Sequence, residues 1–335
     1  MILFATSDRI GKGTGGGIVT LNELEALQRI GPVDIYNPQP TANPFDADNG
    51  IDALDLSKYR LAHFYAGTFP KLTQKLKERG VKITYTAAAH DIDVSQKEFI
   101  KAGVNYDFPH ITNPELWATY LSSYLNADCI ICPSKHSAQI MNKFGCGNIT
   151  VIPHGCHPGA DYRYPKSFSV GYLGQIGPDK GVRYLIEAWE MCNLPDAVLT
   201  LAGNQSPMLV PLIRQFGCKA NYNILGYVNT IDDFFKSINL YVQPSVTEGF
   251  GIEVLEAMAF GRPVISTKGV GASDCLHEYC RLIDTCDVKA ISNEIRSYYD
   301  NMTDMRSELM KHSAKYDWSV IKDYYVDLWK GMLDS

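Results

Sequence analysis

The spacing of apolar residues divides the chain into short apolar runs that alternate with longer amphipathic segments. The apolar runs predict buried strands at residues 1–6, 33–36, 61–65, 82–88, 129–133, 149–153, 168–173, 197–203, 221–228, 238–242 and 263–267. Apolar residues at helical spacing predict helices, the clearest at residues 18–30, 71–82, 115–126, 182–191, 252–260 and 318–333. Strands that alternate with helices are typical of parallel sheets covered by helices, so the sequence predicts an α/β fold.

The opening of the chain, a strand followed by a glycine-rich turn and a helix, occurs a second time. Residues 1–6 lead into the turn G-K-G-T-G-G-G at 11–17. About 160 residues later, residues 168–173 lead into G-Q-I-G-P-D-K-G at 174–181. Each opening is typical of the first βα turn of a Rossmann-like domain. A chain of 335 residues is long enough for two such domains, and residues 155–167 hold the predicted linker.

The stretch from Tyr241 to Ile265 combines an apolar helix with three carboxylates. The predicted strand ends in a short loop, and residues 252–260 then leave the helix almost no polar face. This helix nevertheless carries Glu253 and Glu256, and Glu248 lies in the loop before it. An unpaired buried carboxylate is costly, so these groups need hydrogen-bonding partners, which a ligand with several hydroxyls would provide.

The backbone of the same loop predicts a place for an anion. Gly249 and Gly251 let the chain turn sharply into the helix. The N–H groups of Phe250, Gly251 and Ile252 then point from the helix N-terminus toward any anion near the loop.

Glu248 and Glu256, with seven residues between them inside E-G-F-G-I-x-x-L-E-A-M-A-x-G-x-P-V-I, resemble the signature of the group 1 glycosyl transferases. The passage from A-D-C-I-I-C-P-S-K-H-S to V-I-P-H-G is similar to the end of the N-terminal half in that family. The family comprises retaining, nucleotide-sugar-dependent enzymes of glycosyltransferase family 4. The alternative interpretation is an ordinary strand, loop and helix with two surface glutamates.

The resemblance implies a GT-B fold, in which two Rossmann-like parallel-sheet domains face each other across a cleft. The expected N-terminal, acceptor-side domain is 1–158, and the expected C-terminal, donor-side domain is 159–317. A final helix at 318–335 is expected to cross back to the N-terminal domain. The implied activity is that of a hexosyltransferase that moves a sugar from a nucleotide diphosphate to an acceptor hydroxyl.

The family's functional roles carry over to matching positions of this chain. Glu256 would accept hydrogen bonds from the ribose, and Glu248 from the transferred sugar. His90, at the carboxyl end of a predicted strand, would reach that sugar. Tyr227 is expected either beside the nucleotide base or in the core. The remaining donor-binding positions are the N-terminal turn and the loop before the helix at 252–260: Gly16, Gly17, Gly249, Phe250, Gly251 and Ile252.

The turn at 174–181 departs from the family pattern. It usually reads G-R-x-x-x-x-K-G, in which Arg and Lys both bind the donor pyrophosphate. Lys180 occupies the matching position, but Gln175 replaces the Arg. Because neutralising a departing diphosphate is much of the catalysis, the loss of a cation matters. Three alternatives remain open: Lys180 and the helix N-terminus suffice to bind the pyrophosphate, Lys12 or Arg9 replaces the missing cation, or the enzyme has weak activity.

Two rival functions remain open at this point. Gly11, Gly13 and Gly16 match G-x-G-x-x-G, and Asp34 would be the acidic partner of an NAD-dependent oxidoreductase. That interpretation leaves the Glu248–Glu256 run unexplained. The exchange at Gln175 alone favours a GT-B sugar-nucleotide binding protein that lacks transfer activity.

Composition narrows the classes of partner. The net charge of −6 argues against nucleic acid as a partner. No run approaches the ~20 apolar residues of a membrane span, and the first residues do not form a signal peptide, so we expect a cytoplasmic protein. The basic helix at 71–82 would allow a peripheral membrane contact, although a solvated helix face explains its lysines better. The expected partners are a nucleotide-sugar donor and an acceptor glycan, lipid or other hydroxyl compound.

The cysteines predict neither a disulfide framework nor a metal site. All nine are scattered, and they are typical of small core residues in a reducing compartment. The cluster of His154, Cys156 and His157 fits no zinc spacing, and neither does the pair Cys129 and Cys132. The resemblance implies no metal, and no cofactor beyond the donor substrate.

Overall fold

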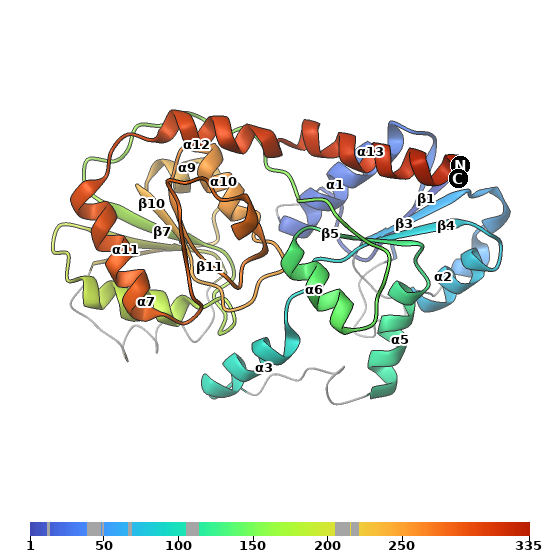
Figure 1. Cartoon of the computed structure of the whole chain (residues 1–335), viewed down its shortest axis with the longest axis horizontal. Helices are drawn as coiled ribbons and strands as arrows, with labels where there is room; N and C mark the ends of the chain where they lie inside the picture. Colours follow the sequence, from blue (N-terminus) through green and yellow to red (C-terminus); the bar gives the residue numbers. More distant parts are fainter. Residues whose placement is uncertain are drawn as a thin grey trace. The chain divides into compact units, whose positions relative to one another are not determined.

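The computed structural model describes residues 1–11, 14–38, 48, 50–65, 69–104, 114–204, 215 and 221–335. The chain forms two compact units (Figure 1). Unit 1 comprises Met1–Ala89, Asp107–His154 and Trp318–Ser335. Unit 2 comprises His90–Tyr106 and Gly155–Asp317.

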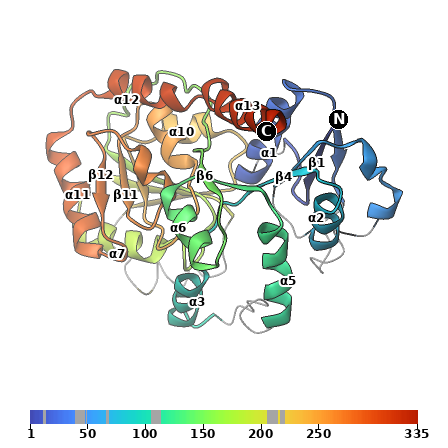
Figure 2. The same ribbon diagram turned by 45° about the vertical axis from the view of Figure 1, so that its right-hand side comes forward.

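Unit 1 is built on a parallel sheet with the strand order β2-β1-β3-β4-β5-β6. The strands are β1 (Ile2–Thr6), β2 (Val33–Tyr36), β3 (Leu61–Tyr65), β4 (Lys82–Thr86), β5 (Cys129–Cys132) and β6 (Ile149–Val151). Its helices are α1 (Gly15–Gln28), α2 (Pro70–Lys77), α5 (Pro114–Leu125), α6 (Lys135–Lys143) and α13 (Trp318–Asp334), with short 3-10 turns η2 (Ile51–Ala53) and η3 (Leu56–Lys58). α1 and α13 lie on one face of the sheet, and α2, α5 and α6 lie on the other (Figures 1 and 2).

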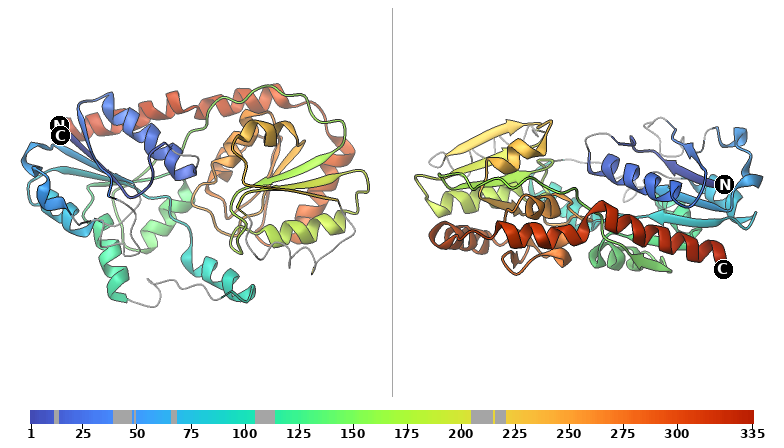
Figure 3. Two further views of the ribbon diagram at one scale, coloured as in Figure 1. Left: turned by 180° about the vertical axis from the view of Figure 1, so that it is seen from behind. Right: turned by 90° about the horizontal axis from the view of Figure 1, so that it is seen from above.

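The C-terminal helix α13 packs on α1 and reaches the sheet of unit 1 (Figure 3). Trp329 Nε1 donates a hydrogen bond of 3.1 Å to Thr84 Oγ1. His63 Nδ1 lies 2.8 Å from the same Thr84 hydroxyl. In the same group of side chains, Glu23 Oε1 accepts a hydrogen bond of 2.7 Å from the Thr86 hydroxyl. All five side chains are buried, so this polar network fixes α13 to unit 1.

Unit 2 has a parallel sheet with the order β12-β11-β10-β7-β8-β9. The strands are β7 (Ser169–Leu173), β8 (Val198–Ala202), β9 (Tyr222–Gly226), β10 (Leu240–Gln243), β11 (Val264–Thr267) and β12 (Arg281–Ile283). Its helices are α3 (Ile92–Lys101), α7 (Val182–Cys192), α9 (Ile231–Lys236), α10 (Glu253–Ala259), α11 (Val288–Asn301) and α12 (Arg306–Ser313), with 3-10 turns η4 (Gly271–Cys275) and η5 (Ala314–Tyr316). α7 packs with α11 on one face, and α10 packs with α12 on the other (Figure 1).

Both sheets confirm the predicted α/β class with two Rossmann-like parallel-sheet units. The inner strands β1, β3, β7 and β10 are buried along their whole length, as expected for parallel strands covered by helices on both faces. If the strands of unit 2 are numbered 1 to 6 from β7 to β12, their order across the sheet, starting from β9, is 3-2-1-4-5-6. This is the strand order of the dinucleotide-binding Rossmann fold.

Two local features differ from the sequence-based expectation. α1 begins at Gly15 rather than near residue 18, because the Thr14 side chain caps the helix by accepting from the Gly17 N–H. Residues 90–106 belong to unit 2, although the expected N-terminal domain of 1–158 included them. Side-chain hydrogen bonds hold this segment to unit 2, and no pattern in the sequence predicts those partners.

Within the residues that the structure describes, no helix is both long and apolar enough to cross a membrane.

Candidate functional site

The carboxyl ends of β7 and β10 meet at the point where unit 2 reverses its strand order. β7 and β10 are neighbours, but the chain runs from them to opposite edges of the sheet. Loops at such a switch point diverge to opposite faces and leave a crevice that binds ligands in open α/β sheets. The loop after β7 carries Lys180, and the loop after β10 carries Glu248.

Close backbone contact holds these two loops together. The Val246 N–H donates a hydrogen bond of 2.8 Å to the Asp179 carbonyl. Gly181, which precedes α7, has φ +68°, and a Cβ there would lie 1.9 Å from the Pro244 carbonyl oxygen. Only glycine fits this position, both for its backbone angle and for its space.

The loop after β11 supports the loop that carries Glu248. The Glu248 N–H donates to the Gly269 carbonyl at 2.8 Å, and the Gly271 N–H donates to the Glu248 carbonyl at 3.1 Å. The Ala272 N–H donates to the Phe250 carbonyl at 2.7 Å. The backbone from Glu248 to Phe250 is therefore held on a second side.

Lys180 and Glu248 form a partly buried ion pair. Lys180 Nζ lies 2.6 Å from Glu248 Oε2, and each side chain is 22% exposed. Burial alone would lower the pKa of Lys180, but the charge and hydrogen bond of Glu248 outweigh it, with help from the charges of Asp179 and Glu253. The net result is a raised pKa, so Lys180 carries its positive charge at neutral pH.

His90 belongs to unit 2, whereas the strand β4 before it belongs to unit 1. His90 is exposed as a residue, yet the surrounding protein removes enough water from its imidazole to lower its pKa, and the charge of Lys180 lowers it further. The charges of Glu248, Asp179 and Asp91 act in the opposite direction. His90, Lys180 and Glu248, the residues predicted to be catalytic, therefore lie within one electrostatic cluster of unit 2.

Glu256 of α10 is buried, as the apolar helix pattern predicts, whereas Glu253 is half-buried. Burial raises the pKa of Glu256 to about 8, and the neighbouring Glu253 contributes to this rise. Burial likewise raises the pKa of Glu253 to about 7, with a further contribution from Glu248. Glu256 is only 8% exposed, and no described residue donates a hydrogen bond to its carboxylate. A buried carboxylate without protein donors is costly unless a ligand supplies them.

Backbone donors lie at the start of the same helix. Within the described part of the chain, the N–H groups of Gly251 and Ile252 donate to no protein acceptor. Gly251 has φ +84°, which turns the chain from the Glu248 loop into α10. These N–H groups can bind an anion near the Lys180 ammonium.

The raised pKa values predict that stability falls as pH rises. The folded state holds the protons of Glu253 and Glu256 more tightly than the unfolded chain, where a glutamate has the ordinary pKa of 4.5. The stabilisation that these two protonated carboxyls contribute is therefore complete below about pH 4.5 and is lost as pH rises toward 8. Relative to Glu256→Gln, we expect the wild type to lose on the order of 2 kcal/mol of unfolding free energy between pH 5 and pH 8.5.

Denaturant unfolding without nucleotide measures this difference. Glu308→Gln, which alters an exposed carboxylate of α12, is the matched control and should keep the wild-type pH dependence. If wild type and Glu256→Gln lose stability in parallel, the Glu256 carboxyl is not held protonated by burial.

The glycine-rich turn that was predicted to bind the donor lies in unit 1, and a carboxyl group of the protein lies against it. Gly16 and Gly17 lie in the first turn of α1, and the Gly17 N–H donates to Thr14 Oγ1 at 3.1 Å. A Cβ at Gly16 would lie 2.3 Å from Asp8 Oδ2, so the Asp8 carboxylate sits against this turn. Burial raises the pKa of Asp8. The role predicted for Gly16 and Gly17 stays a prediction.

Gln175 and Tyr227 are both exposed. Gln175 follows β7, and its carbonyl accepts a hydrogen bond of 2.7 Å from the Tyr172 hydroxyl. Its side chain is therefore on the surface of the turn that carries Lys180. Tyr227 follows β9 and is 58% exposed, so it is not a core tyrosine. Its expected place beside the nucleotide base stays a prediction.

The acidic residue that an NAD site requires is misplaced. Asp34 is the second residue of β2 and pairs with Leu3, at the amino-terminal part of both strands. Ligands of open α/β sheets bind at the opposite, carboxyl edge. The Asp34 carboxylate also lies 2.7 Å from Lys58 Nζ and accepts a bond of 2.9 Å from the Tyr59 hydroxyl. Of the glycine fingerprint, Gly13 lies outside the described residues.

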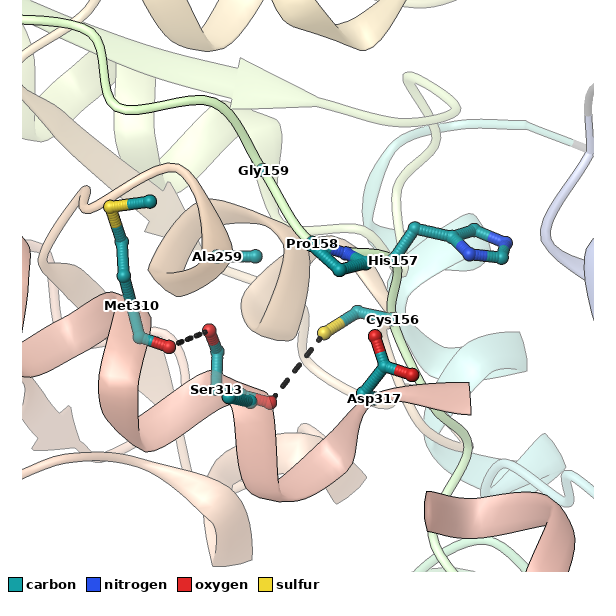
Figure 4. Close-up of a pocket in the computed structure, with 9 residues that line it drawn as sticks. Cys156, His157, Pro158, Gly159, Ala259, Met310, Ser313 and Asp317 are labelled. Atoms are coloured by element: carbon teal, nitrogen blue, oxygen red, sulfur yellow. Dashed lines mark hydrogen bonds between the residues drawn. The ribbon is translucent and has the colours of Figure 1, made fainter. Parts of the chain in front are cut away.

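In the described part of the chain every cysteine except the half-buried Cys286 is buried, and no group of His, Cys, Asp and Glu there is arranged to hold a metal. Cys129 and Cys132, three positions apart on β5, point to opposite faces of the sheet. Cys156 lines a cavity of about 70 Å³, its Sγ directed at the Ser313 carbonyl, while the His157 ring points away from that cavity (Figure 4). Burial raises the pKa of Cys156 to about 12, which disfavours the thiolate that binds metal.

Sequence alone does not identify the polar residues that support this cluster. Thr247 and Asp179 directly precede Glu248 and Lys180, and that adjacency is the one signal that could have marked them. Ser95, which contacts Asp179, lies in a segment for which the sequence predicts no element. Glu253 stands at a variable position of the signature and receives no predicted role.

Comparisons with known proteins agree with the geometry. Residues 162–316 match the family described as glycosyl transferases group 1. An uncharacterized glycosyltransferase of Haemophilus influenzae is 22% identical over 351 residues, covering 97% of both chains.

Solved structures show the same two-domain GT-B fold. A sucrose-phosphate synthase from Thermosynechococcus elongatus superposes with a TM-score of 0.78 at 19% identity, covering 99% of both chains. HepE of Anabaena, solved in complex with UDP and glucose, superposes with a TM-score of 0.73 at 17% identity, covering 99% of this chain and 100% of HepE. The signature around Glu248 and Glu256 and the switch-point pair of Lys180 and Glu248 both lie within residues 162–316, the part of this chain that matches the group 1 glycosyl transferases.

Proposed function

We propose that this glycosyltransferase moves a sugar from a nucleoside diphosphate sugar to an acceptor hydroxyl, with retention of the anomeric configuration. The observation that carries the proposal is Glu256, a buried carboxylate for which the described protein supplies no hydrogen-bond donor. The two hydroxyls of a ribose supply such donors. HepE, which shares the fold, has been solved with UDP and glucose, and a nucleoside diphosphate fits the same chemistry here.

The charged groups of unit 2 suit the remaining parts of the donor. The Lys180 ammonium and the N–H groups of Gly251 and Ile252 can bind the diphosphate. They supply the positive charge that stabilises a departing phosphate, which is why we propose a reaction without a metal. Gln175, on the same turn, adds a neutral hydrogen-bonding group where relatives of this family carry an arginine.

Glu248 and His90 suit the transferred sugar. Glu248 can accept hydrogen bonds from sugar hydroxyls while it keeps Lys180 in place at 2.6 Å. Since its pKa is lowered, His90 is mostly neutral at pH 7 and can act as a hydrogen-bond donor or acceptor for a hydroxyl.

We propose that the departing phosphate oxygen takes the proton of the acceptor hydroxyl on the face from which it leaves. The bond between the anomeric carbon and the phosphate oxygen breaks, the acceptor oxygen bonds to that carbon, and the proton passes to the phosphate. This route needs no nucleophile from the protein. A double displacement through Glu248 would place its carboxylate at the anomeric carbon, whereas Glu248 is here bound to the Lys180 ammonium.

The first test is thermal unfolding of the wild type with UDP, GDP, ADP, TDP and NAD in turn. We expect one nucleoside diphosphate to raise the melting temperature, because a ligand that binds only the folded state stabilises it. Glu256→Ala should weaken that binding by about 1–3 kcal/mol, because it leaves the ribose hydroxyls without their acceptor. Transfer from the matching nucleotide sugar then tests the activity, and the anomeric configuration of the product tests retention.

The control is Glu190→Ala. Glu190 lies in the last turn of α7, far along the helix from the switch point, and accepts a hydrogen bond of 2.6 Å from Tyr222, so nucleotide affinity should be kept. An unchanged dissociation constant in Glu256→Ala would remove Glu256 from the site. A shift with NAD alone would contradict the proposed function.

A further inference from the structure

The segment 90–101 contacts the two loops that carry Lys180 and Glu248. Its first contact is made by the backbone: the Asp91 N–H donates a hydrogen bond of 2.8 Å to Thr247 Oγ1. Thr247 is 1% exposed and directly precedes Glu248. The start of the segment is thereby attached to the loop after β10.

A second contact attaches the segment to the loop after β7. The Ser95 hydroxyl donates a hydrogen bond of 3.0 Å to Asp179 Oδ2, and Asp179 directly precedes Lys180. Ser95 is 1% exposed, so water does not compete for this bond. Through its carbonyl, Asp179 also accepts from Val246, so this one residue connects α3 to both loops.

The far end of α3 is anchored as well. Glu98 is 2% exposed and accepts a hydrogen bond of 2.7 Å from the Tyr184 hydroxyl of α7. Its other carboxylate oxygen lies 2.6 Å from Lys101 Nζ. At the helix start, Asp91 Oδ1 caps α3 by accepting from the Val94 N–H at 3.2 Å. The segment is thus a short rigid helix with three fixed points on unit 2.

We propose that residues 90–101 act as a positioning strap for the transferase site, with Ser95 and Thr247 as positioning residues for His90, Lys180 and Glu248. The proposal rests on the proposed function for its catalytic meaning. The strap binds the residue directly before each of the two charged groups: Asp179 before Lys180 and Thr247 before Glu248. It also carries His90 at its first position, so the same contacts keep His90 within the electrostatic influence of Lys180 and Glu248.

Release of the strap should disturb the site more than the fold. Without the Thr247 or Ser95 hydroxyl, the segment keeps its Glu98–Tyr184 contact, so α3 stays on unit 2. The ring of His90, however, gains freedom to move away from Lys180. Catalysis depends on small distances between positioned groups, so turnover should fall while donor binding through Glu256 is kept.

The test compares Thr247→Val and Ser95→Ala with the wild type by proton NMR titration of the histidines, with the His90 signal assigned from His90→Gln. We expect the His90 pKa to rise toward its ordinary value in both variants, because the ring loses the burial that lowers its pKa most and because the charge of Lys180 becomes more distant. The groups that face His90 from the surrounding elements are Lys180, Glu248, Asp179 and Asp91. Thr247→Ser and Ser95→Thr, which keep a hydroxyl, should restore the wild-type titration.

Kinetics provide the second measurement. With the nucleotide sugar that the wild type uses, kcat should fall about tenfold in each variant, while KM for the donor changes less than about twofold. Ser237→Ala is the matched control, because it removes a hydroxyl that donates to the Phe234 carbonyl at 2.7 Å, at the end of α9. It should lower stability without moving the His90 titration.

An unchanged His90 titration in both Thr247→Val and Ser95→Ala would overturn the proposed strap. This measurement needs no substrate, so it is independent of the proposed function. A wild type that transfers from no nucleotide sugar would instead contradict the proposed function and leave the titration as the decisive test of the strap.

Discussion

Gly181→Ala is expected to destabilise the protein by about 3–5 kcal/mol and to lower transfer by at least ~100-fold. The new Cβ would lie 1.9 Å from the Pro244 carbonyl oxygen. Its nearest neighbours are all backbone atoms of Pro244 and Ser245, so no flexible side chain can move away to make room. The loop with Lys180 would have to separate from the loop that leads to Glu248. Their ion pair of 2.6 Å would then be lost along with stability. Denaturant unfolding and initial transfer rates measure the two effects.

Gly80→Ala separates the backbone strain of Gly181→Ala from its steric clash. Gly80 has φ +71°, close to the +68° of Gly181, but a Cβ there meets nothing within 4 Å. Its replacement should cost about 1 kcal/mol, the usual cost of a left-handed backbone at a residue with a side chain. Similar losses in both variants would mean that the contact with Pro244 is not rigid.

Lys180→Ala is expected to lower turnover by about 10²–10³-fold. The Lys180 ammonium lies at the switch point, where its positive charge can stabilise a departing diphosphate. Its raised pKa keeps it positively charged at neutral pH. Its charge matters most when the phosphate leaves, so turnover should fall more than affinity for the free nucleoside. Rates under saturating donor and calorimetric binding of the nucleoside distinguish the two.

Lys322→Ala is the matched control for Lys180→Ala. Lys322 Nζ lies 2.6 Å from Glu25 Oε2, the distance found for Lys180 and Glu248, and its side chain is 18% exposed. The pair lies in unit 1, on helices α13 and α1. Its loss should cost about 1 kcal/mol of stability or less and leave turnover unchanged. If Lys180→Ala lowers turnover and nucleoside affinity equally, Lys180 does not bind the diphosphate.

Most elements of both sheets could be predicted from the sequence because their cause is local. The runs at 61–65 and 238–242 are apolar on both faces, and covered parallel strands have that pattern. The helix α10 was predictable from its apolar residues and from Gly261 after its end. The segment that forms α3 lacks such a pattern, since polar residues such as Ser95 and Glu98 are the ones it buries.

Of the candidate site, the sequence by itself determined the residue types and the loops that carry them. Glu248 and Glu256 follow from the spacing of a family signature, and Lys180 follows from the family's pattern in the turn at 174–181. The apolar pattern of the helix at 252–260 also predicts that its carboxylates need hydrogen-bonding partners. The exposed places of Gln175 and Tyr227 could not be predicted, since exposure depends on which segments pack over each turn.

Only the tertiary structure decided which groups act on one another. The pairing of Lys180 with Glu248 joins residues 68 positions apart, and the contact of Asp91 with Thr247 joins residues 156 positions apart. The first of these contacts arises because the neighbouring parallel strands β7 and β10 bring their carboxyl ends to one edge of the sheet, whatever their distance along the chain. The low pKa of His90 and the high pKa of Glu256 arise in the same way, since both depend on burial and on charges that distant segments contribute.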